Sequence, residues 1–268
     1  MTTLFGRKYR IQIGQIVIED LTIDFDVKTS LKSAPNTANI GIWNLSENNR
    51  ALLESTTDRI QLDAGHATTG IGTIFIGDAA RATSKHEGPD WVTRIEAGDG
   101  RDRVRNSRVS ASHAPGTQVG QIIRNVSDTL GVGLGNLEQV ASQLTRSISG
   151  QTTTFGHSAT VLERLVSAED LEWSIQRGNL QFLQRGRALA GEAILLSPDT
   201  GLIGSPNRDK DGTVSCDANL MPDLFPGRAV RLESRKETGD FRCTLANYKG
   251  NSRQGDWKIA LKLRDINV

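Results

Sequence analysis

Two acidic residues near the N-terminus have a spacing that could support acid–base chemistry. Asp24 and Asp26 are two positions apart, so an extended strand would place both carboxylates on one face. Such a pair can act as acid and base when burial separates the two pKa values. The neighbours Ile23, Phe25 and Val27 are apolar and would form the opposite, buried face. We therefore expect Asp24 and Asp26 to lie on a solvated polar face and not in a catalytic site.

A second acidic group resembles the start of a calcium-binding loop. Asn207, Asp209, Asp211 and Gly212 have the oxygen-rich spacing of such a loop. The loop also needs a glutamate at its twelfth position, where both carboxylate oxygens bind the ion. That position holds Ala218. A polar turn is therefore the preferred interpretation, and no metal site is predicted here.

Histidines and cysteines are the other possible metal ligands. The four histidines are scattered, and zinc binding needs several nitrogen or sulfur donors that converge; they are His66, His86, His113 and His157. The only cysteines are Cys216 and Cys243, and neither has a second ligand at metal-binding spacing. We expect two small, partly buried side chains, and a single disulfide between their strands is the alternative. No metal site is predicted.

Glycine and serine motifs give no clear sign of cofactor binding or catalysis. Gly131, Gly133 and Gly135 have the composition of a dinucleotide fingerprint, but they follow a predicted helix, whereas the fingerprint follows a strand and opens a helix. No serine lies in a nucleophile elbow. A Ser/His/Asp site built from distant segments remains an alternative. We predict no catalytic, cofactor-binding or metal-binding residues, no cofactor, and a protein that is not an enzyme.

The densest run of basic residues comprises Arg101, Arg103, Arg105 and Arg108. Alternation would put Arg101, Arg103 and Arg105 on one face of a strand. A solvated face with local ion pairs is the preferred interpretation. The alternatives are a strip of salt bridges to another subunit or to a partner protein, and a contact with DNA.

Composition limits the class of protein. Charged residues make up 24% of the 268 residues, yet the formal net charge is only +1. The chain therefore has no large excess of positive charge that would attract nucleic acid or anionic lipid. No apolar run approaches the roughly 20 residues that cross a bilayer. The segment Met1–Arg10 is polar and is not a secretory signal. We expect a protein that folds in a cytoplasm and does not insert into a membrane.

Strand patterns dominate the first hundred residues. Apolar and polar residues alternate with a period of two in several short runs separated by Gly, Asn and Pro, which are Tyr9–Ile18, Leu21–Lys28, Ala38–Trp43, Ile60–Leu62, Thr73–Ile76 and Trp91–Ala97. One helix interrupts them. Ser46 is its predicted N-cap, and Leu52 and Leu53 are expected to face inward. A small barrel or sandwich with one short helix is predicted.

The middle of the chain has helical periodicity, and the last third returns to strands. Residues 101–190 are predicted to contain a helix capped by Thr117, a loop or weak hairpin over Ala141–Phe155, a second helix capped by Ser158, and a hairpin that turns at Arg177–Asn179. From about Ala193 the expected strands are Arg228–Leu232, Phe241–Tyr248 and Trp257–Leu263. The fold class is therefore α+β, mainly β.

An ordered set of motifs resembles the baseplate or tail hub proteins of long-tailed bacteriophages. The segments that carry the resemblance are Gly77–Ala79, Gly88–Trp91, Glu96–Gly100, Ser112–Gly120 (SHAPGTQVG), Leu171–Leu183 (LEWSIQRGNLQFL), Thr200–Pro206 (TGLIGSP), Leu224–Ser234 (LFPGRAVRLES) and Gly255–Trp257. No single motif is decisive, but together they keep the order of the family over nearly the whole chain.

The resemblance implies a fold and an assembly. Two tail-tube-like β-barrel domains, residues 1–100 and 191–268, would flank a small α/β domain, residues 101–190. Three copies would form a ring that adapts the sixfold tail tube to the threefold central spike or tip and leaves a channel for DNA. The expected elements of the ring contact are the strands at Leu21–Val27 and Arg228–Leu232.

The resemblance also implies partners and a location. They are further copies in a homotrimer, the tail tube or distal tail protein, the spike or tip protein, and a baseplate wedge or tape measure protein, with DNA only in passage. The protein would belong to the virion tail. Two alternatives remain. The first is another tail adaptor or distal tail protein, which a sixfold ring would favour. The second is a cell-wall hydrolase, which would need two carboxylates at catalytic separation.

Overall fold

The computed structural model describes residues 6–55 and 57–266, and the chain folds into two compact units. Unit 1 contains residues 1–30, 36–99 and 186–268, so it combines the two outer thirds of the chain. Unit 2 contains residues 31–35 and 100–185. The first five residues of the polar N-terminal segment lie outside the described part. The predicted fold class, α+β and mainly β, is confirmed by the elements of both units.

The described residues of unit 1 form one thirteen-stranded sheet with a single helix beside it. Its elements are β1 (Arg7–Ile13), β2 (Ile16–Ile18), β3 (Ile23–Ser30), β4 (Thr37–Trp43), α1 (Glu47–Ser55), β5 (Arg59–His66), β6 (Gly70–Glu87), β7 (Asp90–Gly98), β12 (Ile194–Leu196), β13 (Leu202–Arg208), β14 (Val214–Asn219), β15 (Ala229–Glu233), β16 (Thr238–Asn251) and β17 (Trp257–Asp265).

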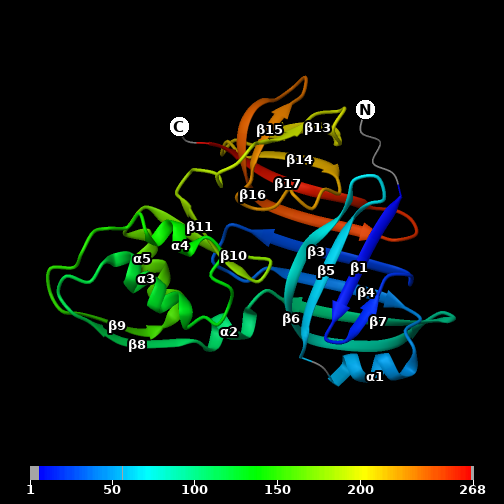
Figure 1. The fold of residues 1–268 in the computed structure, drawn as a ribbon. Coiled ribbons are helices and arrows are strands. Elements are labelled where there is room, and N and C mark those ends of the chain that lie inside the picture. The colour runs from blue at the N-terminus through cyan, green and yellow to red at the C-terminus, as the bar shows by residue number, and fades with distance from the viewer. Residues whose placement is uncertain (1–5, 56, 267–268) are drawn as a thin grey trace. The chain divides into compact units, whose positions relative to one another are not determined.

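The two outer thirds meet in this sheet at one pair of strands. The strand order is β13-β14-β17-β16-β3-β4-β7-β6-β5-β1-β2, with β15 paired to β16 and β12 paired to β15. The order therefore passes once from C-terminal to N-terminal strands, between β16 and β3, as Figure 1 shows in orange and blue. Among the described residues the main order has two ends, β13 and β2, and the side branch ends at β12, so the sheet does not close into a barrel. The division of this sheet into two tail-tube-like domains stays a prediction.

Predicted strand alternation is confirmed in the buried faces of unit 1. In β3, Ile23, Phe25 and Val27 are buried, and the residues between them are partly or fully exposed. These side chains belong to one apolar core that also includes residues of the last strands, such as Tyr248 and Trp257. Because the N-terminal and C-terminal strands bury their apolar faces in the same core, they depend on each other for stability.

Helix α1 begins where the sequence predicts. Ser46 precedes it and its Oγ accepts a hydrogen bond from the Asn49 amide at 3.3 Å, as an N-cap does. Leu53 is buried, but the expectation that Leu52 also faces inward is wrong, because Leu52 is 57% exposed. Successive helical residues are separated by about 100° around the axis, so a narrow contact face buries only one of the two.

Unit 2 contains four helices and two separate pairs of strands. Its elements are α2 (Arg101–Asn106), β8 (Arg108–His113), α3 (Val119–Asp128), α4 (Leu137–Ala141), β9 (Thr152–His157), α5 (Ser158–Ser167), β10 (Leu171–Gln176) and β11 (Asn179–Gln184). The hairpin β10–β11 turns at Arg177 and Gly178, both with positive φ, as predicted. The apolar faces of α3 and α5 and the hairpin share a second core.

Three expectations for the middle of the chain need correction. Thr117 does not cap α3, because Gln118 is the N-cap residue and the Thr117 hydroxyl donates to the Ala114 carbonyl. Ser158 lies within α5, and His157 precedes it. The segment 141–155 is not a local hairpin: it ends in β9, which pairs with the distant β8. Local patterns could not reveal a strand whose partner lies about 40 residues earlier.

The expected arginine strand is a helix. Arg101, Arg103 and Arg105 belong to α2, and only Arg108 lies in a strand, at the start of β8. Gly100 adopts a left-handed conformation (φ 65°) and its carbonyl accepts a hydrogen bond from the Val104 amide at 2.8 Å, which closes the first turn. Six residues are too few for helical periodicity to show in the sequence. The side chain of Arg101 lies outside the described part of the structure.

Candidate assembly surface

The two acidic residues Asp24 and Asp26 lie on the outer, polar face of β3, and each meets its own cation. Arg94 Nη1, from β7, lies 2.7 Å from Asp24 Oδ1 and 2.8 Å from Oδ2. Lys249 Nζ, from β16, lies 3.7 Å from Asp26 Oδ2. All four side chains are about one third to two fifths exposed. The two carboxylates are therefore neutralised separately across strands and do not form a shared site.

Strand register extends this face into a charged row across the sheet. The paired positions run from Lys258 on β17 to Lys249 on β16, Asp26 on β3, Asn39 on β4, Glu96 on β7 and Arg81 on β6. Side chains at directly paired positions on one face are near neighbours. The row thus gives the middle of unit 1 a continuous polar surface over strands from both outer thirds.

A groove lies over this surface. It has a volume of about 700 Å³ and follows β3, β4, β7 and β16. Asp24, Asp26, Glu96 and Asp256 contribute four negative charges to its lining, and Arg94 and Lys249 contribute two positive charges. The lining therefore has a net charge of −2. An acidic groove of this kind repels phosphate groups more than it attracts them.

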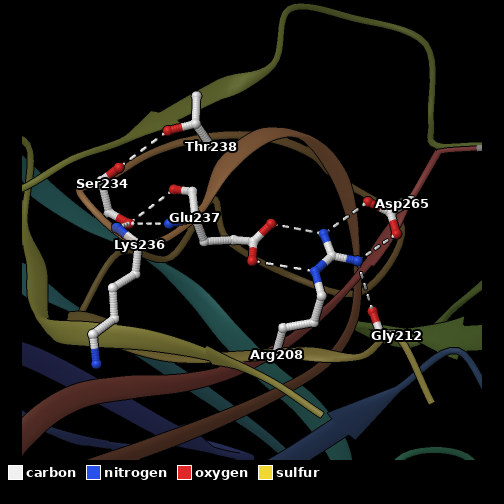
Figure 2. A network of polar contacts seen from close by, with 7 residues as sticks. All are labelled: Arg208, Gly212, Ser234, Lys236, Glu237, Thr238 and Asp265. Carbon is white, nitrogen blue, oxygen red and sulfur yellow. Dashed lines mark hydrogen bonds and ion pairs between the residues drawn. The ribbon is translucent and has the colours of Figure 1, made fainter. Parts of the chain in front are cut away.

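A second polar network joins three strand ends in the C-terminal part of unit 1 (Figure 2). Arg208, at the end of β13, binds Glu237 through Nη2 and Nε at 2.7 and 3.1 Å. The same guanidinium binds Asp265, at the end of β17, through Nη1 and Nη2 at 2.8 and 3.1 Å. Nη1 also donates to the Gly212 carbonyl at 3.4 Å. One planar cation thus holds an edge strand against the turn before β16 and the end of β17.

The charges of this network stabilise one another. Hydrogen bonds from Arg208 hold the pKa of Glu237 and the pKa of Asp265 below their usual values. Hydrogen bonds to Asp265 and Glu237 raise the pKa of Arg208 in turn. Glu237 sits in a tight turn in which Ser234 Oγ accepts from the Glu237 amide at 3.0 Å. The arrangement is suited to fixing strand ends, not to transferring protons.

The polar residues of the calcium-like pattern lie at the end of β13, as for Asn207, and in the turn between β13 and β14. Asp211 accepts hydrogen bonds from the Thr213 amide and hydroxyl at 3.1 and 3.0 Å, and it pairs with Arg264 at 3.0 Å. Asn207 donates to Asp209 at 3.1 Å. Ala218 is buried in β14. Each side chain of the pattern that could bind an ion is therefore engaged in local hydrogen bonds.

The four histidines lie in different elements. His66 is buried at the end of β5, and burial lowers its pKa. His86 stacks on Trp91 with ring centroids 3.8 Å apart, and His113 bonds the Thr154 hydroxyl at 3.0 Å. His157 Nε2 donates to the Arg105 carbonyl at 2.9 Å. Within residues 6–55 and 57–266, no three His, Cys, Asp or Glu side chains are grouped so as to hold a metal ion.

The glycine pattern and the cysteines have structural places. Gly131 follows α3 with φ 65°, and Gly133 and Gly135 pack against the β10–β11 hairpin, so the three glycines connect two helices. Cys216 and Cys243 are both free and buried, on β14 and β16. Burial raises the pKa of Cys216 to about 12 and also raises the pKa of Cys243.

The two strands expected to form a ring contact have neighbours on both sides. β3 pairs with β16 and β4, and β15, which covers most of Arg228–Leu232, pairs with β12 and β16. Neither strand offers a free backbone edge. Sequence reasoning did not find Arg94 or Arg208, since their partners are 70 and 57 residues away or lie in a turn. The only signal in the sequence was that each is a charged residue within a strand.

Similarity to known proteins is found in the fold and not in the sequence. No protein-family model and no curated protein sequence matches the chain. Among solved structures, the 43 kDa tail protein of prophage MuSo2 from Shewanella oneidensis matches with a TM-score of 0.67 and 8% identity over 97% of both chains. The tail protein from Neisseria meningitidis MC58 matches with a TM-score of 0.67 and 9% identity over 97% of both chains.

A third similar structure comes from a secretion system. The Escherichia coli c3393 protein, a component of the type VI secretion system with structural similarity to the bacteriophage T4 tail proteins gp27 and gp5, matches with a TM-score of 0.61 and 10% identity, over 96% of this chain and 77% of that one. The chain therefore has the fold of phage tail proteins, and the resemblance found in the sequence is confirmed for the fold. Among residues 6–55 and 57–266, no helix combines the length and apolar character needed to cross a membrane.

Proposed function

We propose that this chain is a structural tail or baseplate hub protein that forms a homotrimeric ring between a sixfold tail tube and a threefold central spike or tip. The observation that carries the proposal is the match to two tail proteins over 97% of their length and of this chain. A partial match would be compatible with one shared domain in an unrelated protein. A match along the whole chain supports a shared architecture and a role in assembly.

The sheet of unit 1 supports the geometry of this role. Its strand order divides cleanly at β16 and β3 into C-terminal and N-terminal strands. We propose that the two sets correspond to two tail-tube-like halves, residues 1–100 and 191–268, with the α/β domain between them in sequence. Three copies would then present six halves to a sixfold tube. The symmetry mismatch would be resolved within each chain, because each chain contributes two halves.

The acidic groove supports a channel through which DNA passes without binding. Its lining has two more carboxylates than cations. Phosphate groups would be repelled by such a surface, and tight DNA binding needs several unpaired cations. We propose that this polar face of β3, β4, β7 and β16 is turned toward the channel.

Ring contacts would be made by side chains and not by pairing of strand edges. The end strand β13 has an irregular register between Ile203 and Asn207, and Pro206, which lacks an N–H group, lies inside it. At the other end β2 has only three residues, and β12, where the side branch ends, also has three. Bulges, prolines and short edge strands all block edge-to-edge pairing. Packing of apolar side chains is the remaining source of a stable obligate interface.

The remaining parts of the proposal are partners and location. The ring would contact the tail tube or distal tail protein on one side and the spike or tip protein on the other, with a baseplate wedge or tape measure protein around or within it. The protein would be part of the virion tail. We do not expect an enzyme, since the charged residues of the two polar networks, Asp24, Asp26 and Arg208, are engaged in cross-strand and turn contacts.

Light scattering on the purified protein, followed by electron microscopy of single particles, tests the proposal. We expect a mass of about three times the 29.1 kDa of the chain and a threefold ring with a central hole. A sixfold ring would instead favour a distal tail or adaptor protein. A monomer at all concentrations would contradict the proposal, and clearing of purified cell walls would indicate a hydrolase.

A further inference from the structure

The most exposed large apolar side chain of the described structure belongs to unit 2. Phe155 is 76% exposed, whereas the next, Leu52, is 57% exposed. Phe155 lies on β9, where its neighbour Thr154 is buried on the other face. Strand alternation therefore turns the ring of Phe155 outward. One exposed phenylalanine is not by itself a binding site, so its surroundings decide what it does.

Strand β8 places a cation and hydroxyl groups beside this ring. In the antiparallel pair, Ser110 is opposite Phe155 and Arg108 is opposite His157. Residues two apart on one strand share a face, so Arg108, Ser110, Phe155 and His157 line the same surface. We call this surface the Phe155 face and include Arg105, whose carbonyl accepts hydrogen bonds from His157 and Arg108. It combines one aromatic ring with positive charge and hydrogen-bonding groups.

The cations of the Phe155 face have no described acidic partner. Arg108 Nη1 donates to the carbonyls of Ser107 and Arg105 at 3.0 and 3.4 Å, and His157 donates to the same Arg105 carbonyl. No ion pair joins Arg105 or Arg108 to any described carboxylate. By contrast, three other arginines of unit 2 are paired, Arg124 with Glu138, Arg146 with Glu169 and Arg185 with Asp170. Positive charge on the Phe155 face is therefore left for a ligand.

We propose that the Phe155 face binds an extended, acidic segment of a partner protein that carries at least one large apolar side chain. Carboxylates of the segment would pair with Arg105 and Arg108, and its apolar side chain would pack on the exposed ring. Arginine and aromatic residues are the types that most often dominate the free energy of such contacts. The proposal concerns unit 2 alone and does not depend on the ring.

A protein segment fits this face better than a nucleic acid. Binding of DNA depends on many cations that follow the phosphates, with a strong dependence on salt. The Phe155 face has two unpaired arginines and one ring, and the whole chain has a net charge of only +1. One aromatic anchor on the same face as a pair of cations offers contacts for a short peptide. DNA is therefore an alternative outcome of the test.

Fluorescence anisotropy with labelled probes on the full chain tests the proposal. The probes are a 12-residue peptide of alternating Glu and Leu, the same length of alternating Lys and Leu, the same length of alternating Glu and Ser, and a 12-nucleotide single-stranded DNA. We expect the Glu/Leu peptide to bind at least about tenfold more tightly than each of the others, since only it satisfies both the charge and the apolar anchor. Its binding should weaken moderately as salt is added.

Two variants of the face and two matched controls complete the test. Phe155→Ser and the double variant Arg105→Gln/Arg108→Gln should each weaken binding of the Glu/Leu peptide at least about tenfold. The controls Leu52→Ser, at an exposed leucine of α1, and Arg164→Gln, at an exposed arginine of α5, should leave it unchanged. Circular dichroism should show native helix and strand content in all four proteins, because these side chains are exposed.

Several results would overturn the proposal. They are failure of the Glu/Leu peptide to bind, equal binding of the Lys/Leu peptide, and unchanged binding by Phe155→Ser or by the double arginine variant. Tighter binding of the DNA, lost in the arginine variant and steep in salt, would replace the protein partner with a nucleic acid. A trimer measured by light scattering would leave all of these outcomes unaffected, so the two proposals fail separately.

Discussion

Arg94 Nη1 lies 2.7 Å from Asp24 Oδ1, although the two residues are on β7 and β3 and a third strand, β4, runs between them. The β4 residue in register with both is Gly41. A Cβ atom at Gly41 would clash with Arg94 Nη1 and with Asp24 Oδ1. The absence of a side chain at Gly41 therefore leaves the room in which the two charges meet across two strand spacings. The Arg94 guanidinium also lies 5.0 Å from the centre of the Trp43 ring.

Gly41→Ala should uncouple Arg94 from Asp24. In the native protein a double-mutant cycle with Asp24→Asn and Arg94→Gln is expected to give a coupling free energy of about 0.5–1 kcal/mol, the usual range for half-exposed pairs. In a Gly41→Ala background the coupling should fall close to zero, because the methyl group occupies the path. Urea unfolding of the single and double variants measures both values.

Gly150→Ala is the matched control for this cycle, because a Cβ atom at Gly150 would meet no neighbour. It should leave the coupling between Asp24 and Arg94 unchanged. An undiminished coupling in Gly41→Ala would mean that the two side chains reach each other by another path, and the role assigned to Gly41 would then be wrong.

Arg208 should make the stability of unit 1 depend on pH in the acid range. It lowers the folded-state pKa of Glu237 and Asp265 below the ordinary values of 4.5 and 3.8. A lowered folded-state pKa contributes stability above the unfolded-state value, and this contribution is lost as pH falls through the folded-state value. The native protein should therefore melt at a higher temperature than Arg208→Gln at neutral pH. The difference should shrink as both carboxylates are protonated.

Thermal unfolding of both proteins from about pH 7 to about pH 2.5 measures this effect, over a range that includes protonation of both carboxylates. Arg185→Gln is a suitable control, since its pair with Asp170 is exposed and has an N–O distance of 3.6 Å. It should change the melting temperature little at any pH. A constant difference between native protein and Arg208→Gln over the whole range would show that Arg208 acts by packing and not by charge.

Local features of this fold were readable from the sequence, and long-range ones were not. The alternation in Ile23–Val27 predicted a half-buried strand with Asp24 and Asp26 on its polar face, because the period of two is a property of the strand alone. The pairing of β3 with β16 joins residues more than 200 positions apart, as at Val27 and Tyr248, and no local pattern encodes it. The pairing of Asp24 with Arg94 could not be predicted for the same reason, since Arg94 is 70 residues away in the sequence.

Short elements and ends of elements were the other source of error. The arginines at 101, 103 and 105 alternate as a strand would, but the left-handed Gly100 and the buried Val104 favour a short helix. The outward turn of Phe155 was not foreseen either, because β9 has a polar run, Thr152–Thr154, before it and pairs with the distant β8. In both cases the local sequence allowed two outcomes, helix or strand at residues 101–105 and an inward or outward Phe155 ring, and tertiary contacts selected one of them.

Both cysteines should be inert in the folded protein. The thiolate is the reactive form, and burial raises the pKa of Cys216 to about 12, while the pKa of Cys243 is raised as well. At about pH 8, Ellman's reagent should therefore react with neither thiol over minutes and with both after denaturation in urea. Fast reaction of one native thiol would contradict their burial. Fewer than two reactive thiols per denatured chain would indicate a disulfide.

Trp257 should connect the stability of the C-terminal strands to that of the N-terminal strands. Its Nε1 donates to the Gly65 carbonyl on β5 at 3.0 Å, and its ring meets the edge of Phe25 on β3 with centroids 5.3 Å apart. Trp257→Phe removes the donor and leaves a buried carbonyl without that partner, which should cost about 1–3 kcal/mol. Trp91→Phe is the control: Trp91 is only partly buried and stacks under Arg50 at 4.2 Å, so its loss should cost less.

Urea unfolding followed by circular dichroism and by tryptophan fluorescence distinguishes one cooperative sheet from two independent halves. If unit 1 unfolds as one body, Trp257→Phe should shift the unfolding of N-terminal and C-terminal strands by the same amount, because both bury their apolar faces in one core. Hydrogen exchange in β5 and in β16 reports the two sides separately. Loss of protection in β16 alone, with β5 unchanged, would show that the two outer thirds are separate folding units despite the shared sheet.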